Sequence, residues 1–193
     1  MSLLVFIGVP GAGKRSIVGQ LSQYGYMGCD VETATAARLH VPVSQMYLEC
    51  SAAERATATV AVLEELYADI RQAPDQRFCL ALPPKVCGCV GEKDEVDDPY
   101  AALRAQLVAQ ASEVIWLQAE LSTLMTRNAL IGMRSALFIM PRKEFRLLSE
   151  AYAPIFEELS TAQYDTTHSS VAQATQEILE QLHIECEHSS ITD

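Results

Sequence analysis

Residues 3–16 read LLVFIGVPGAGKRS. The stretch begins with a continuous apolar run over residues 3–7, which is typical of a fully buried parallel β-strand. A glycine-rich turn follows, and the next segment, 16–23, has a helical pattern. The frame Gly8-x4-Gly13-Lys14 is the core of a phosphate-binding loop. The sequence therefore predicts a strand, a phosphate-binding loop and a helix in succession; the alternative is an ordinary glycine-rich turn between a strand and a helix.

The residue types of this loop suit an anion. Glycines let backbone N–H groups turn inward and approach a phosphate closely, and the helix that follows adds its positive N-terminal end. A lysine at the end of the loop places a point charge on the β- and γ-phosphates of a nucleotide. We therefore predict that the phosphate-binding residues are Gly8, Gly11, Ala12, Gly13 and Lys14.

One position departs from the motif. A serine or threonine directly after the lysine normally supplies the hydroxyl that binds magnesium. Here that residue is Arg15, and the hydroxyl comes one position later, at Ser16. Arginine carries a permanent positive charge where a ligand of the cation should be. We predict that Arg15 and Ser16 both contact nucleotide, with Ser16 as the candidate metal ligand.

Composition limits the classes of function. The chain has 193 residues, is 49% hydrophobic and carries a formal charge of −11. This size suits one α/β domain over residues 1–193, and the negative charge disfavours nonspecific binding to nucleic acid or to anionic membranes. No signal peptide or membrane span is expected. Six cysteines without a secretory signal indicate free thiols in a reducing cytoplasm. The close pair Cys87 and Cys89 could begin a metal site or could be two thiols in a loop.

Apolar segments and helical patterns alternate along the chain. Further strands are expected at 25–30, 78–82, 113–117 and 162–166. Helices are expected at 32–39, from 43, at 51–71, at 100–110, from 122, from 141 to about 152, and from 169 or 170 to about 183. Irregular structure is expected at 83–99, and a loose tail at 185–193. This alternation predicts an α/β fold with three layers: a five-stranded parallel sheet with helices on both faces, as in P-loop NTPases.

Two acidic residues follow the second strand. Asp30 and Glu32 are two positions apart, and ligands bind at the carboxyl ends of strands in an open parallel sheet. The pair could hold magnesium-bound water or the hydroxyl of a substrate. The alternative is that Asp30 caps a helix beginning near Val31, with Glu32 in its first turn.

The order of these features resembles the shikimate kinase family, among the P-loop folds like that of nucleoside monophosphate kinases. The resemblance spans about residues 3–183 and rests first on the phosphate-binding loop. Its other parts are Gly25-Tyr26 followed by Asp30 and Glu32, Leu124-x-x-Arg127 with Arg134 seven residues later, Ala153-Pro154-Ile155-Phe156, and Tyr164-Asp165-Thr166.

The resemblance implies a set of roles. The family transfers a phosphoryl group from ATP to the 3-hydroxyl of shikimate with magnesium. Arg134 would lie over the transferring phosphate in a lid at about 129–141, and Arg127 would lie against adenine. Asp30 would be catalytic together with Lys14 and Arg134, and it would share the metal with Ser16. Glu32 and Arg55 would contact the substrate.

The departures fall on the acceptor side. The family has three glycines after its third strand, where this chain has Pro83-Pro84, and proline donates no N–H. The family has an arginine where this chain has Tyr152. Arg55 is one position out of register with a second arginine of the family. We therefore predict an ATP-binding phosphotransferase that acts on a small hydroxylated metabolite. One alternative is an inactive nucleotide-binding pseudokinase with a protein partner, and another is an interaction protein with an empty loop.

Overall fold

A computed structural model describes residues 2–90, 98–128 and 142–182 of the chain. Its centre is a five-stranded parallel sheet in the order β2-β3-β1-β4-β5. The strands are β1 (Ser2–Ile7), β2 (Tyr26–Asp30), β3 (Arg77–Ala81), β4 (Glu113–Gln118) and β5 (Ala162–Asp165). In the register, Val5 of β1 lies between Leu80 of β3 and Val114 of β4. The predicted five-stranded parallel sheet is confirmed.

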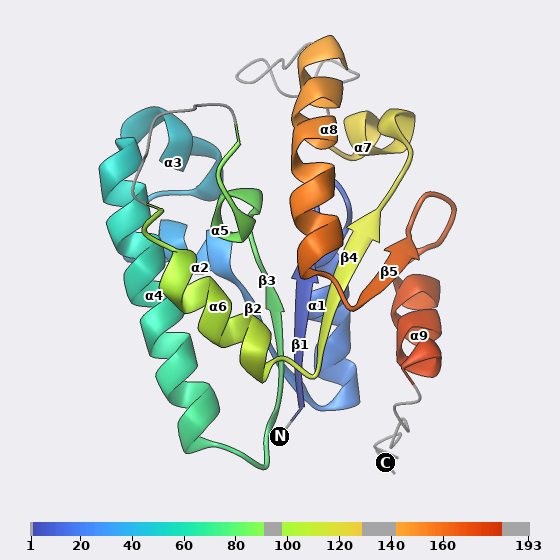
Figure 1. Cartoon of the computed structure of the whole chain (residues 1–193), viewed down its shortest axis with the longest axis horizontal. Helices are drawn as coiled ribbons and strands as arrows, with labels where there is room; N and C mark the ends of the chain where they lie inside the picture. Colours follow the sequence, from blue (N-terminus) through green and yellow to red (C-terminus); the bar gives the residue numbers. More distant parts are fainter. Residues whose placement is uncertain (1, 91–97, 129–141, 183–193) are drawn as a thin grey trace.

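Helices cover both faces of this sheet (Figure 1). They are α1 (Lys14–Leu21), α2 (Val31–Arg38), α3 (Val43–Glu49), α4 (Ala52–Gln72), α5 (Pro84–Cys87), α6 (Ala101–Gln110), α7 (Leu121–Arg127), α8 (Arg142–Leu159) and α9 (Val171–Gln181), with a short 3₁₀ helix η1 (Ser22–Tyr24) after α1. Figure 1 shows α6 and α8 in front of the sheet and α1 behind it. None of the helices in the described residues is long and apolar enough to span a bilayer.

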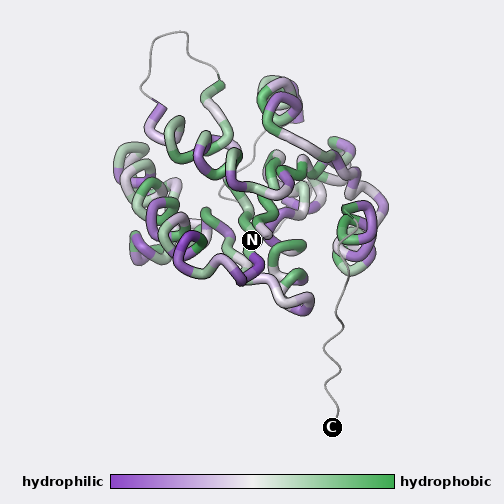
Figure 2. The backbone as a smooth tube through the Cα atoms, turned by 60° about the horizontal axis from the view of Figure 1, so that its bottom comes forward, coloured by the Kyte–Doolittle hydropathy of each residue, from purple (hydrophilic) through white to green (hydrophobic). Residues whose placement is uncertain are grey.

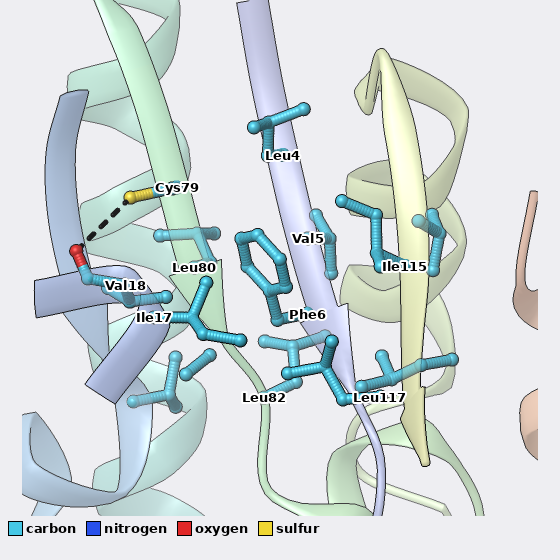
Figure 3. Packing of buried hydrophobic residues seen from close by; sticks show 14 of the residues in the cluster. Leu4, Val5, Phe6, Ile17, Val18, Cys79, Leu80, Leu82, Ile115 and Leu117 are labelled. Carbon is cyan, nitrogen blue, oxygen red and sulfur yellow. Dashed lines mark hydrogen bonds between the residues drawn. The ribbon is translucent and has the colours of Figure 1, made fainter. Parts of the chain in front are cut away.

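The apolar run of β1 forms the middle of the core. Leu3, Leu4, Val5 and Phe6 are all fully buried. In Figure 3, the side chains of β1 pack with those of β3, β4 and α1, and the Cys79 thiol donates to the carbonyl oxygen of Val18 at 3.7 Å. The central strand needs apolar residues at consecutive positions because both of its faces are covered.

The strand order changes direction at β1. The chain passes from β1 outward to β2 and returns through β3, whereas β4 lies on the other side of β1 and leads outward to β5. In open parallel sheets, ligands bind at such a reversal, outside the carboxyl ends of the strands. The loop after β1, which carries the glycine-rich motif, therefore lies where this fold places ligands.

Local signals determine how several helices begin. Ser51 and Glu54 form a capping box at the start of α4, and Ser170 and Gln173 form another at the start of α9. Each box pairs backbone N–H groups at the helix start with side-chain oxygens. The helices are amphipathic, and Figure 2 shows hydrophilic and hydrophobic residues alternating along them. These features follow the predicted pattern.

The prediction that the helix from 141 ends near Tyr152 is wrong. The helix α8 continues to Leu159 with Pro154 inside it. A proline removes one helical hydrogen bond, a cost that tertiary packing can offset. Tyr152 and Phe156, four residues apart, are both buried, and their rings stack with centroids 5.4 Å apart. This burial of one helix face stabilises the helix across Pro154.

The prediction of irregular structure at 83–99 is wrong at its start. The helix α5 begins directly after Pro83, with Pro84 in its first turn. Proline is favoured there because its fixed φ suits a helix and its missing N–H would be unpaired in any case. Cys87, the last residue of this helix, is buried. No group of three or more metal-ligating side chains occurs among the described residues. The predicted lid at 129–141 and the tail at 185–193 lie outside the described residues.

Candidate functional site

The glycine-rich loop turns sharply between β1 and α1. Gly8, Gly11 and Gly13 all have positive φ, at 139°, 83° and 98°. A Cβ on Gly8 would lie 2.5 Å from the carbonyl oxygen of Leu117 in β4. The loop therefore requires glycine for its backbone conformation, and at Gly8 also for its close approach to the neighbouring strand.

Lys14 is the first residue of α1, and its ammonium group is folded back on the loop. Lys14 Nζ donates to the carbonyl oxygens of Gly8 at 2.6 Å and of Val9 at 3.1 Å. Burial lowers the pKa of Lys14, and the negative charges of nearby groups, including Glu32 and Asp30, oppose that shift. The cation is therefore desolvated and only partly compensated, which favours an anion in front of it.

A pocket of about 710 Å³ opens in front of this loop. Its lining comes from the loop and α1, from the end of β2, from the end of α7, and from the segment between β5 and α9. These residues are Pro10, Gly11, Gly13, Lys14, Arg15, Ser16, Ile17, Asp30, Glu32, Arg127, Asn128, Thr166, Ser169, Ser170, Val171 and Ala174. Most of the predicted site residues therefore meet in one pocket. Gly8 and Ala12 belong to the loop but are not among the lining residues. Arg134 lies outside the described residues.

Asp30 occupies the N-cap position of α2, as one of the two interpretations expects, but its carboxylate caps no backbone N–H. Oδ2 instead accepts a hydrogen bond from the Thr33 hydroxyl at 2.6 Å and lies 3.7 Å from Arg15 Nε. The Asp30 side chain is mostly covered, whereas that of Arg15 is 69% exposed. The arginine that follows the lysine of the motif thus turns toward the carboxylate that was predicted to bind metal.

The arrangement does not fit magnesium as it stands. Magnesium binds through one or two carboxylates, waters and substrate phosphates. Ser16 lines the pocket, but the Asp30 carboxylate is already engaged by the guanidinium of Arg15 and by Thr33. A cation beside Asp30 would face the permanent charge of Arg15. The residues around Asp30 therefore hold a protein cation in the region where the metal was predicted.

Arg127 ties three segments together at the end of α7. Its guanidinium donates to the Thr166 hydroxyl at 2.8 Å, to the Thr166 carbonyl oxygen at 2.6 Å and to the Gly11 carbonyl oxygen at 3.4 Å. Thr166 Oγ1 also lies 3.1 Å from the carbonyl oxygen of Ala12. Arg127 thus holds the phosphate-binding loop against the end of β5, while it also lines the pocket. Its contact with adenine stays a prediction.

Several pocket residues were not predicted as part of the site. Asn128 Nδ2 donates to the carbonyl oxygens of Pro10 and Leu124, both at 2.9 Å. Thr166, Ser169 and Ser170 line the pocket from the segment after β5. Their polar character at the carboxyl end of a strand was the available signal. Nothing in the sequence pairs Asn128 with a loop more than a hundred positions away.

A second, much smaller pocket of about 50 Å³ lies next to the first. Glu32 lines both pockets, and Arg55 and Lys85 line the second one only. The structure therefore brings the two predicted substrate residues, Glu32 and Arg55, to one place. Tyr47 also lines this pocket, and its hydroxyl donates to Glu32 Oε1 at 2.5 Å. Tyr47 and Lys85 were not predicted as site residues.

Apolar packing occupies another part of the acceptor side. Tyr152 stands where the resemblance expects an arginine, and it is buried against Phe156. Burial raises the pKa of Tyr152 to about 12, so it is uncharged at neutral pH. The carbon atoms of Ile155 would lie 3.1 Å from a Cβ on Gly88, so α8 packs closely on the chain after α5. Tyr152 therefore supplies no charge at this position.

Comparison with known proteins gives solved structures alone. No family model matches the chain, and no curated protein matches its sequence. Shikimate kinase from Acinetobacter baumannii in complex with shikimate has a TM-score of 0.69 and 16% identity, covering 95% of this chain and 93% of that one. Shikimate kinase from Aquifex aeolicus has a TM-score of 0.64 and 15% identity, covering 94% and 96%. Deoxyadenosine kinase from M. mycoides has a TM-score of 0.54 and 15% identity, covering 94% and 98%. The chain therefore has the P-loop kinase fold of the shikimate kinases and related nucleotide kinases.

Proposed function

We propose that this chain binds ATP and transfers its terminal phosphoryl group to a small hydroxylated metabolite. The observation that carries the proposal is the pocket in front of the glycine-rich loop, where a desolvated Lys14 and the start of α1 face the same space. Backbone N–H groups, a helix N-terminus and a buried cation together favour bound phosphates. The likeness of the fold to shikimate and deoxyadenosine kinases supports the same class of reaction.

In this proposal the parts of the pocket divide the work. Lys14 leaves the carbonyl oxygens of Gly8 and Val9 and binds the β- and γ-phosphates, because phosphate oxygens are stronger acceptors than carbonyls. Arg127 and the segment around Ser170 flank the base and ribose. Glu32, which lines both pockets, accepts the hydrogen bond of the acceptor hydroxyl. Phosphoryl transfer needs such positioning and positive charge more than covalent help from the protein.

The metabolite differs from shikimate in this proposal. The buried Tyr152 and the two prolines at the start of α5 replace groups that the resemblance assigns to the shikimate carboxylate and hydroxyls. Each lost hydrogen bond to a charged group weakens binding by about 1.5–3 kcal/mol. Two or three such losses would remove most of the affinity for shikimate.

A second candidate function is that of a nucleotide-binding pseudokinase. The ion pair between Arg15 and Asp30 favours it, because a protein cation then stands where a kinase would hold a metal ion. Arg15 would partly supply the charge that nucleotide phosphates need. The bound nucleotide would then set a conformation that a protein partner recognises.

Calorimetric titration of ATP, repeated with magnesium chelated, separates the two candidates. Binding that requires magnesium supports the phosphotransferase and justifies a screen of hydroxylated metabolites for ATP-dependent phosphorylation. Binding of equal affinity without magnesium supports the pseudokinase. Absence of binding down to millimolar affinity would overturn both candidates and leave a loop that is retained as part of the scaffold.

Replacing Arg15 is expected to strengthen the response of ATP binding to magnesium. The variant Arg15→Ser supplies a hydroxyl directly after Lys14 and releases the Asp30 carboxylate. We expect magnesium to tighten ATP binding to this variant about 10-fold more than it tightens binding to wild-type protein, or about 1.4 kcal/mol. Calorimetry on Arg38→Ser is the matched control, because Arg38 pairs with Glu65 on the surface and does not line the pocket. An Arg15→Ser variant that binds ATP equally with and without magnesium would contradict this role of Arg15.

A further inference from the structure

Tyr47 is one of the side chains that line the smaller pocket, and it contacts two others. Tyr47 lies on α3, its hydroxyl donates to Glu32 Oε1, and its ring lies under the guanidinium of Arg55 at 5.0 Å. Arg55 is held in turn by its hydrogen bond to the Cys50 carbonyl oxygen. In this state the pocket measures about 50 Å³, which is room for one or two waters and not for a sugar-sized molecule.

The Tyr47 hydroxyl occupies the position that an acceptor would need. Among the described residues, Glu32 is the one that lines both the larger pocket and the smaller pocket. A hydroxyl that donates to Glu32 is therefore beside the place where the phosphates bind in the proposed function. The hydroxyl of Tyr47 makes this contact in the structure, so a hydroxylated ligand in the smaller pocket would compete with Tyr47 for Glu32 Oε1.

Tyr47 is partly exposed and does not belong to the hydrophobic core. The residue is 42% exposed, so rotation about its side-chain bonds would turn the ring into solvent without unpacking the core. The only buried side chain of α3 is Met46, in a helix of seven residues. By contrast, Thr35 and Thr59, which form the inner wall of the pocket, are buried and lie 3.1 Å apart at their hydroxyls. Tyr47 can therefore leave the pocket at a lower cost in packing than the buried threonines of the inner wall.

We propose that Tyr47 is a gate over an acceptor site formed by Glu32, Arg55, Lys85, Thr35 and Thr59. The gate is shut when Tyr47 donates to Glu32 and opens when a small hydroxylated molecule takes over that hydrogen bond. The role of this pocket as an acceptor site rests on the proposed function, whereas the opening of the gate does not. A closed gate lowers the apparent affinity for the acceptor in proportion to the fraction of open molecules.

Access to the inner wall of the pocket tests the gate without ATP. In a Thr59→Cys background, the rate at which a small methanethiosulfonate reagent modifies residue 59 is followed by peptide mass spectrometry. The exposed Cys89 serves as the internal reference in every sample. The gate predicts slow modification with Tyr47 in place, faster modification with Tyr47→Phe, which loses the bond to Glu32, and at least about 10-fold faster modification with Tyr47→Ala.

Leu48→Ala is the matched control, because Leu48 is the next residue of α3, is 52% exposed and does not line the pocket. Equal rates for Tyr47→Ala and Leu48→Ala would overturn the gate. If Tyr47→Ala fails to fold, Tyr47→Phe decides: a rate equal to that of the Thr59→Cys background alone overturns the gate. If wild-type protein does not bind ATP, the proposed function is wrong. The labelling rates then test the gate independently of that function.

Discussion

Replacing Lys14 with methionine is expected to weaken ATP binding by about 100-fold while the protein stays folded. Lys14, at the end of the glycine-rich loop, lines the larger pocket and supplies a cation there. Each hydrogen bond between charged groups contributes about 1.5–3 kcal/mol, or roughly 10- to 100-fold in affinity. Methionine keeps the length and the apolar stem of the side chain and removes only the charge and its hydrogen bonds.

Calorimetric titration of ATP measures this loss, and thermal unfolding of the same variant shows whether the fold survives. Lys143→Met is the matched control, because Lys143 is exposed on α8 and does not line the pocket. We expect the control to bind ATP with the affinity of wild-type protein. Equal affinity of Lys14→Met and Lys143→Met would mean that the phosphates do not bind at the loop, and the proposed function would then be wrong.

The parts of the structure that the sequence predicts are those determined by nearby residues. The apolar run of β1 is recognisable because a strand covered on both faces needs consecutive apolar residues. The capping boxes at Ser51 and Ser170 depend on pairs only three positions apart. The positive φ angles of Gly8 and Gly11 likewise follow from the loop motif itself. The sheet, the loop and these two helix starts could therefore be predicted before the structure.

The predictions are wrong where packing against distant residues determines where a helix begins or ends. Pro154 normally ends a helix, but the burial of Tyr152 and Phe156 carries α8 past it. The pair Pro83-Pro84 suggests a loop by itself, yet the same residues start a helix when the next turn packs in the core, as Val86 does. In both cases, packing against the rest of the molecule overrides the local preference.

The candidate site divides in the same way. Lys14, Asp30 and Glu32 were predicted because each stands at a recognisable position after a strand. The bond from Asn128 to Pro10 and the contact between Tyr47 and Glu32 join segments whose proximity only the folded chain establishes. The ion pair of Arg15 with Asp30 combines two positions that the sequence singled out separately. Motifs thus predict which residues belong to the candidate site, whereas the folded structure shows which residues contact one another.

Replacing Gly8 with alanine is expected to cause the largest loss of stability. The new Cβ would lie 2.5 Å from the Leu117 carbonyl oxygen, a backbone atom of the central sheet that cannot rotate away. The residue also has a φ of 139°, which an alanine adopts only with strain. Backbone strain costs about 1–3 kcal/mol and overpacking a similar amount, so we expect a loss of roughly 2–5 kcal/mol in the free energy of unfolding. For a domain of this size, the melting temperature should fall by roughly 5–15 °C.

Gly19→Ala is the matched control in the same strand–loop–helix unit. Gly19 lies within α1, and a Cβ added there meets no atom within 4 Å. Alanine favours the helix over glycine by about 0.5–1 kcal/mol, so the control should melt a few degrees higher than wild-type protein. Thermal unfolding followed by circular dichroism compares the two variants directly. If Gly8→Ala melted as high as Gly19→Ala, the loop would have to lie further from β4 than the structure has it.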